Sequence, residues 1–178
     1  MQNRHVKYFK MQLNAMPQEV PDAMRLTSAF FALSGLDLLN SLDNAMAGRK
    51  KDAIEWIYKL QVTKAGPRSG FRSSTMIPDS IETVYHCGHL AMTYTGLAAL
   101  LILGDDLSRV DKESILEGIK ACQNPDGAFM AMVTGCESDM RFVYCACCIS
   151  AILDDWSGMN KARAIDYILK SLVSIYKI

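Results

Sequence analysis

The pattern of apolar and charged positions divides the chain into two kinds of helix. Residues 88–103 and 142–153 carry no Asp, Glu, Lys or Arg. A helix that is apolar on all sides must be covered on all sides, and residues 142–153 are too few to span a bilayer, which takes about 20 apolar residues. We therefore expect buried inner helices at residues 88–103 and 138–153, the second with Asp139 and Arg141 as a charged collar at its start.

Amphipathic stretches alternate with these inner helices. Residues 50–60 and 111–122 place apolar side chains on one face and charged side chains on the other, which predicts outer helices. Asp111 is expected to cap the second of them, and Asn160 to cap a last helix at residues 160–177. Two further helices are expected at residues 4–13 and 23–46, and Pro17 and Pro21 should break the helix between them. A loop is expected at residues 62–86 and an Asn-Pro-Asp-Gly turn at residues 124–127.

The same unit occurs twice. Each outer helix ends in a glutamine, Gln61 or Gln123, and leads through a turn with Gly and Phe to an inner helix, so that residues 94–97 align with residues 144–147. Residues 160–177 have the pattern of a third outer helix. The prediction is an all-α chain of helical hairpins, and stacked hairpins form either an open solenoid or a closed α/α toroid.

A toroid encloses a central cavity, and the N-terminal ends of its inner helices line that cavity. The polar residues at these starts, His89, Asp139 and Arg141, would lie at one rim of a central cavity, close to positive helix termini. Such a cavity would be apolar lower down and cationic at its mouth. It would suit a ligand with an apolar tail and an anionic head.

Composition narrows the classes of function. The 178 residues suit one domain (residues 1–178), and their formal net charge of zero gives no support for binding to nucleic acid or for a polybasic membrane role. The first ten residues are polar and basic, without the apolar core of a secretory signal. The six cysteines are therefore expected to be reduced thiols in the cytoplasm, and the three in one helix (145, 147 and 148) to be small packing residues.

Several polar or aromatic positions have two interpretations. His86, Cys87 and His89 could suggest a metal site, but neighbouring residues at a loop–helix boundary rarely converge as tetrahedral zinc requires. The Gly-Asp-Asp run at residues 104–106 is better explained as a helix end followed by the next helix start than as a cation site. Arg141 could bind a ligand or pair only with Asp139, Glu137 or a carboxylate of a neighbouring repeat. Phe30 and Phe31 cannot face the same way, so one is expected to pack and the other to line the cavity.

Three runs of residues carry a resemblance to a known family: residues 88–97 (GHLAMTYTGL), 102–110 (ILGDDLSRV) and 139–145 (DMRFVYC). Together with residues 25–37, 55–58 and 156–159 they are similar to the protein prenyltransferase β subunits, and most similar to those of geranylgeranyltransferase type I. The similarity extends over about residues 5–167. It implies part of an α/α barrel, of which this chain would supply the N-terminal half.

The resemblance also implies an activity. Such subunits pair with a separate helical α subunit and transfer a prenyl group, here geranylgeranyl from geranylgeranyl diphosphate, to a cysteine near the C-terminus of CaaX proteins such as small GTPases. A zinc ion activates that thiol, since metal coordination lowers a thiol's pKa and thiolate is the nucleophile. The zinc ligands and the basic cluster for the diphosphate belong to the other half of the barrel. We therefore assign no catalytic residue and no metal ligand here, and expect an incomplete, cytoplasmic transferase subunit.

Residue by residue, the resemblance assigns two groups of positions. The isoprenoid would lie against Arg141, Tyr144 and Cys145. The small Thr27 stands where farnesyl-transferring relatives carry an aromatic residue, which fits a longer lipid. The CaaX peptide would contact Thr27, Phe31, His89, Ala91, Arg141 and Phe142. Of these residues, His89, Ala91 and Phe142 would form the pocket for the last residue of the peptide.

Two other classes of function remain open. The chain could be a non-catalytic helical-repeat module that binds only the α subunit or lipid, which the missing zinc half favours. A glycan-processing α/α toroid would need a pair of carboxylates in its cavity, and the inner helices offer only Asp139 at a rim. An open half-barrel is also expected to expose apolar surface along its last outer helix and to be poorly stable.

Overall fold

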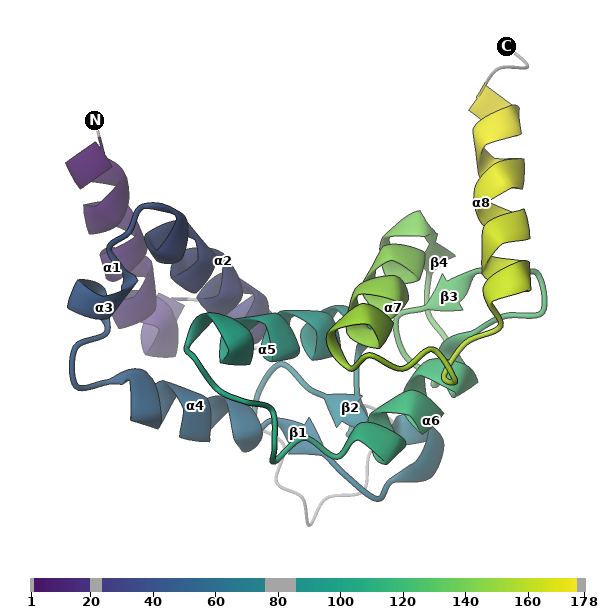
Figure 1. Ribbon diagram of the computed structural model, residues 1–178, viewed down its shortest axis with the longest axis horizontal. Coiled ribbons are helices and arrows are strands. Elements are labelled where there is room, and N and C mark those ends of the chain that lie inside the picture. The colour runs from purple at the N-terminus through teal and green to yellow at the C-terminus, as the bar shows by residue number, and fades with distance from the viewer. Residues whose placement is uncertain (1, 20–23, 76–85, 176–178) are drawn as a thin grey trace.

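The computed structural model describes residues 2–19, 24–75 and 86–175, with side chains for residues 2–14, 24–75 and 86–172. Its helices are α1 (Gln2–Glu19), α2 (Arg25–Leu38), α3 (Leu42–Ala45), α4 (Lys50–Tyr58), α5 (Leu90–Ile102), α6 (Lys112–Cys122), α7 (Met140–Ile152) and α8 (Lys161–Ile175). They form an open arc, with α2, α5 and α7 along its concave side and α4 and α6 along its convex side (Figure 1). None of the helices in the described ranges is long and apolar enough to cross a membrane.

The inner helices pack side by side in chain order, α2 on α5 and α5 on α7, and α1 covers α2. They supply many of the fully buried side chains, such as Leu26, Leu36, Leu97, Leu100 and Ile149. This confirms the prediction that the uncharged stretches are inner helices and the charged ones outer helices.

All three inner helices end in the same way. A residue in the left-handed conformation follows each helix, and the next amide bonds the carbonyl five positions earlier at 2.9 to 3.0 Å. The shared ending makes α2 a third inner helix, and its hairpin with α1 precedes the two predicted units in the chain. The left-handed residues are Asn40 (φ 50°), Gly104 (φ 87°) and Asp154 (φ 49°).

Three predicted boundaries are wrong. The helix expected at residues 23–46 ends at Leu38, where the left-handed Asn40 interrupts it before the short helix α3. The expected first residue of that helix, residue 23, and the predicted breaker Pro21 lie outside the described residues. The first helix continues past Pro17 to Glu19, since a proline removes only one backbone donor and α1 gains packing against α2. The helix α7 begins at Met140 rather than at residue 138, because the two preceding residues form a strand.

Short antiparallel strand pairs join outer to inner helices. Strand β1 (Gln61–Val62) pairs with β2 (Gly70–Phe71), and β3 (Phe129–Met130) pairs with β4 (Ser138–Asp139). The predicted loop at residues 62–86 therefore contains the strand β2 and the 3₁₀ turn η2 (Gly66–Arg68), while residues 76–85 lie outside the described ranges. Gln61 faces Phe71 as Gln123 faces Phe129, which confirms the repeated Gln and Gly/Phe turn.

Each of these glutamines also fixes the start of the next outer helix. The side-chain oxygen of Gln61 accepts from the Asp111 amide at 2.8 Å, and that of Gln123 accepts from the Asn160 amide at 2.7 Å. Asp111 and Asn160 in turn accept from the amide three residues on, both at 3.1 Å. The two predicted N-caps are confirmed, and the repeated glutamine holds them in place.

Candidate functional site

The starts of two inner helices carry polar residues at equivalent positions, 50 residues apart. His89 accepts a hydrogen bond through Nδ1 from the Ala91 amide at 3.1 Å, and Asp139 accepts one from the Arg141 amide at 2.8 Å. Both side chains are therefore N-caps, which satisfy helix donors that would otherwise lack a partner. The predicted rim residues lie together at the same end of neighbouring helices.

An aromatic row crosses the three inner helices. The ring centroids of Phe30 on α2 and Tyr94 on α5 are 5.6 Å apart, and those of Tyr94 and Tyr144 on α7 are again 5.6 Å apart. The two tyrosine hydroxyls approach to 3.4 Å, and this contact raises the pKa of Tyr144. Since Tyr144 is 58 % exposed, the row offers apolar ring surface to a ligand.

Two members of this row, Phe30 and Tyr94, were not predicted as site residues. Tyr94 could have been predicted from the alignment of residues 94–97 with 144–147. It is aligned with Tyr144, and equivalent positions of stacked repeats lie on the same surface. Phe30 could be found only after α2 was recognised as an inner helix.

The α2 residues Thr27 and Phe31 lie beside this row. Thr27 donates from its hydroxyl to the sulfur of Met92 on α5 at 3.5 Å, so it ties the two inner helices together. Phe31 contacts Phe30 with centroids 5.5 Å apart and is 61 % exposed, whereas Phe30 packs against the core. This confirms that one of the two phenylalanines packs and the other is free to meet a ligand.

Arg141 is held by two carboxylates. Its Nε donates to both Asp139 oxygens at 3.0 and 3.1 Å, and its Nη2 reaches Asp139 at 2.6 Å and Glu137 at 3.0 Å. These bonds, first from Asp139 and then from Glu137, raise the pKa of Arg141, and Arg141 lowers that of Asp139. Two carboxylates around one guanidinium make this part of the rim acidic, so the prediction of a cationic mouth is wrong here.

His89, Ala91 and Phe142 come together as the resemblance implied. The rings of His89 and Phe142 meet edge to face at 5.9 Å. Burial lowers the pKa of His89, and the charge of Glu137 opposes this only in part, so the imidazole is neutral. Because Nδ1 accepts a hydrogen bond, Nε2 carries the proton and is the atom that could donate to a ligand.

The cysteines of the described part are free thiols, and Cys145 is buried at 7 % exposed. Burial raises its pKa to about 11, so Cys145 is a packing residue with little surface for a ligand. Within residues 2–14, 24–75 and 86–172, no three His, Cys, Asp or Glu side chains converge to hold a metal ion. These residues therefore do not form the zinc site that the resemblance implies.

Comparison with known sequences gives consistent matches. The sequence model of the prenyltransferase alpha-alpha toroid domain matches residues 1–174. The chain is 39 % identical to the geranylgeranyl transferase type-1 subunit beta of Arabidopsis thaliana, over 94 % of this chain and 47 % of that protein. It is 36 % identical to the corresponding subunit of Dictyostelium discoideum, over 93 % and 53 %.

Among solved structures, Candida albicans protein geranylgeranyltransferase-I complexed with GGPP contains a chain with the same fold. The TM-score is 0.78 at 21 % identity, and the match covers 95 % of this chain and 50 % of that one. The chain thus spans about half the length of the relatives it matches.

Proposed function

Because the chain belongs to the prenyltransferase α/α-toroid family, we propose that it forms the lipid- and peptide-binding wall of a geranylgeranyltransferase type I β subunit. The observation that carries this proposal is the aromatic row of Phe30, Tyr94 and Tyr144, which runs across three inner helices. Rings that meet edge to face at regular spacing suit a long, flexible apolar chain, since they bury its surface without requiring one conformation.

The peptide side of the proposal rests on the residues around this row. Thr27 and Phe31 would contact the side chains of a CaaX peptide, and the neutral His89 with Ala91 and Phe142 would surround its last residue. Arg141 would contact the bound substrates through Nη1, since Asp139 and Glu137 engage its other nitrogens. Tyr144 would lie beside the isoprenoid, and the buried Cys145 would pack behind it.

The reaction in which this wall takes part joins a cysteine sulfur to C1 of the geranylgeranyl group. The bond between C1 and the diphosphate oxygen breaks, the diphosphate leaves, and the thiol loses its proton. This transfer requires an α subunit and, from the resemblance, a zinc ion that the described residues do not hold. We propose that this activity is cytoplasmic, as the resemblance implies.

A second candidate function is binding without turnover. The observation that favours it is the aromatic row of Phe30, Tyr94 and Tyr144, which can bind an apolar chain without any reacting group. In that case the chain would bind lipid or the α subunit and would not transfer the prenyl group.

The test uses the chain co-expressed with the α subunit of the same organism. A fluorescent geranylgeranyl diphosphate analogue reports lipid binding, and a CaaX peptide with zinc reports turnover. Tyr144→Ala should weaken lipid binding about fivefold, since one aromatic contact is worth roughly 1 kcal/mol. Tyr8→Ala, at a similarly exposed tyrosine of α1, is the matched control and should leave the affinity unchanged.

A second pair of variants tests the peptide side. Arg141→Ala should weaken peptide binding, and Arg163→Ala on α8 should not. Absence of lipid binding, or equal effects of the two tyrosine variants, would refute the proposal. Lipid binding without turnover would select the second candidate, and turnover would select the transferase.

A further inference from the structure

The helix α1, at one end of the arc, has two faces of different chemistry (Figure 1). Its inward face packs against the core through three partly buried apolar residues: Val6, Phe9 and Leu13. Each residue turns a helix by about 100°, so the face nearly opposite to these three consists of Arg4, Lys7, Tyr8 and Met11. These four residues, which we call the outer face of α1, are all exposed, Tyr8 at 53 % and Met11 at 54 %.

The outer face of α1 carries positive charge that is not neutralised. Residues 2–14 contain Arg4, Lys7 and Lys10 but no Asp or Glu. Within the part of the chain that the structure describes, none of these three cations takes part in an ion pair. The formal net charge of zero for the whole chain is therefore unevenly distributed, with a local excess of positive charge on this helix.

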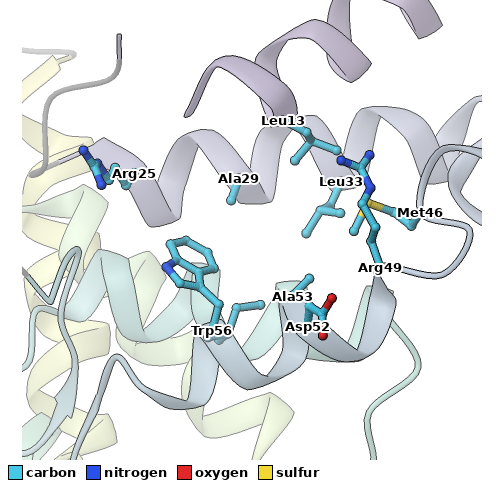
Figure 2. A pocket seen from close by; sticks show the side chains of 10 residues that line it. Leu13, Arg25, Ala29, Leu33, Met46, Arg49, Asp52, Ala53 and Trp56 are labelled. Carbon is cyan, nitrogen blue, oxygen red and sulfur yellow. The ribbon is translucent and has the colours of Figure 1, made fainter. Parts of the chain in front are cut away.

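Arg49, just before α4, adds a fourth cation beside α1. Its guanidinium donates to the Asn14 side chain of α1 at 2.9 Å and to the Ala45 carbonyl at 3.0 Å, and both acceptors are neutral. Arg49 lines the pocket between α1, α2 and α4, and Figure 2 shows its guanidinium directed toward α1 rather than toward the Asp52 carboxylate. The exposed acids Asp37 and Asp52 lower the net charge of this end of the molecule, so we expect a moderate attraction that salt screens.

The mixture of side chains on this face indicates the kind of partner. Cations interleaved with exposed apolar residues are typical of helices that lie on a membrane surface. The ring of Tyr8 and the side chain of Met11 can enter the head-group region, while the long side chains of the cations keep their charges at the level of the lipid phosphates. A convex helix face with flexible cationic side chains suits a soft, planar anionic surface better than a rigid acidic pocket.

We propose that the outer face of α1, together with Lys10 and Arg49, docks the protein on an anionic membrane surface. Four cations are at the lower end of what recruits anionic lipids, and each should contribute a factor of about five in affinity, or about 1 kcal/mol. The attachment is therefore peripheral and reversible. It goes beyond the proposed function, because it requires neither the aromatic row nor a prenyl diphosphate.

Co-sedimentation of the full chain with vesicles tests the proposal. Vesicles with about 30 % phosphatidylserine should bind the chain at least about tenfold more tightly than pure phosphatidylcholine vesicles at low salt, and about 0.5 M NaCl should remove the difference. Equal binding to the two kinds of vesicle would overturn the proposal. Inorganic diphosphate below about 1 mM should not compete, and competition would overturn the proposal by revealing a discrete anion site instead of a surface.

Charge variants locate the surface. The double variant Arg4→Gln, Lys7→Gln should weaken binding to the anionic vesicles about 25-fold. The control Lys120→Gln, Arg163→Gln removes the same charge from exposed positions of α6 and α8 and should bind like the parent, as should the charge-conserving variant Arg4→Lys, Lys7→Arg. Equal losses in the two glutamine variants would show an effect of net charge alone and would overturn the assignment to α1.

Two further measurements separate a membrane from a protein partner. Met11→Ala should weaken vesicle binding about fivefold, whereas Met24→Ala, at a similarly exposed methionine before α2, should not. The chain bound to its α subunit should keep its preference for anionic vesicles. Unchanged binding by Met11→Ala, or loss of vesicle binding in the complex with the α subunit, would overturn the proposal, and the second result would assign the outer face of α1 to that subunit.

Discussion

Asp139 holds Arg141 through both the backbone and the side chain. One carboxylate oxygen accepts from the Arg141 amide at 2.8 Å, and the same carboxylate accepts from the guanidinium at 2.6 to 3.1 Å. Asp139 therefore caps α7 and, together with Glu137, positions its arginine.

Replacement of Asp139 should separate these two roles. Asp139→Ala should destabilise the chain by about 1 kcal/mol, the usual value of an N-cap, and Asp139→Asn should cost less because Asn also caps helices. The pKa of Asp139 is lowered in the folded chain. Its charge therefore stabilises the fold above the ordinary pKa of about 4, and this stabilisation is lost as pH falls through the lowered pKa of the folded chain. Urea midpoints of the parent and of Asp139→Asn should accordingly converge in acid. A gap that stays constant with pH would show that the charge of Asp139 does not contribute.

The cap at His89 should also lose its contribution as pH falls, but at a higher, mildly acidic pH. Its pKa is lowered by burial, so the neutral form that caps α5 stabilises the fold above the ordinary pKa of about 6.5, and this contribution is lost as pH falls through the folded value. His89→Asn keeps a cap that does not titrate. We expect the parent to lose stability relative to His89→Asn between about pH 7.5 and pH 5. His5→Asn, on the exposed side of α1, is the control, and an identical pH profile for parent and His89→Asn would contradict the prediction.

Thr93 links an inner helix to a strand of the preceding turn. Its hydroxyl accepts from the Phe71 amide at 2.9 Å and donates to the His89 carbonyl at 3.0 Å. Thr93→Val should cost about 1–3 kcal/mol, because it leaves a buried amide without a partner. Thr95→Val, whose hydroxyl only donates to carbonyls of its own helix, should cost less than about 1 kcal/mol in the same denaturation experiment. Equal costs would mean that the Phe71 amide finds another acceptor.

Gly118 allows α6 to approach the turn before β2. A Cβ atom at this position would overlap the backbone carbonyl oxygen of Ser69, which cannot move away as a side chain can. Gly118→Ala should therefore destabilise the chain by about 1–3 kcal/mol despite the better helix propensity of alanine. At Gly96 a Cβ would meet the Phe71 ring at 3.1 Å, so Gly96→Ala should be tolerated better. The thermal midpoints of the two variants decide this, and a Gly118→Ala midpoint at or above that of Gly96→Ala would contradict the prediction.

The last outer helix should promote self-association. Ile165, Leu169 and Leu172 of α8 are each more than 50 % exposed and follow the spacing of one helix face, which agrees with the predicted apolar surface along this helix. Leu169→Gln should reduce association in light scattering and change the free energy of unfolding by less than about 0.5 kcal/mol. Lys170→Gln, beside it on the charged side, should leave association unchanged. A parent chain that is monodisperse and monomeric at high concentration would contradict the prediction.

Periodicity and charge predicted the layers of the fold, and the reasons are local. The runs at residues 88–103 and 142–153 are apolar on every side, and Asp111 and Asn160 stand where helix donors need a partner. The first unit could not be recognised this way. Its inner helix α2 contains Gly35, and glycine has a low helix propensity. Only the structure shows that the Phe9 ring of α1 occupies the space that a Cβ atom would take at this position.

Part of the candidate site could be read from the sequence. Tyr144 and Phe31, which the resemblance assigned to the site, are exposed side chains. Asp139 and Glu137 were named as possible partners of Arg141 from their nearness in the sequence, and both pair with it. The contact of Phe30 with Tyr94 depends on which segments the fold brings together, and no spacing within one helix encodes it. A pocket lined by residues of α1, α2 and α4 depends on such contacts as well.

The side-by-side packing of α2, α5 and α7 also bears on how the chain can assemble. The inner helices α5 and α7 each pack on the inner helix that precedes them in the sequence, and the Gln61 and Gln123 side chains hold the start of an outer helix that comes later. A chain built from such hairpins can add one hairpin at a time as it leaves the ribosome. The repeat that aligns the aromatic row is thus compatible with folding from the N-terminus during synthesis.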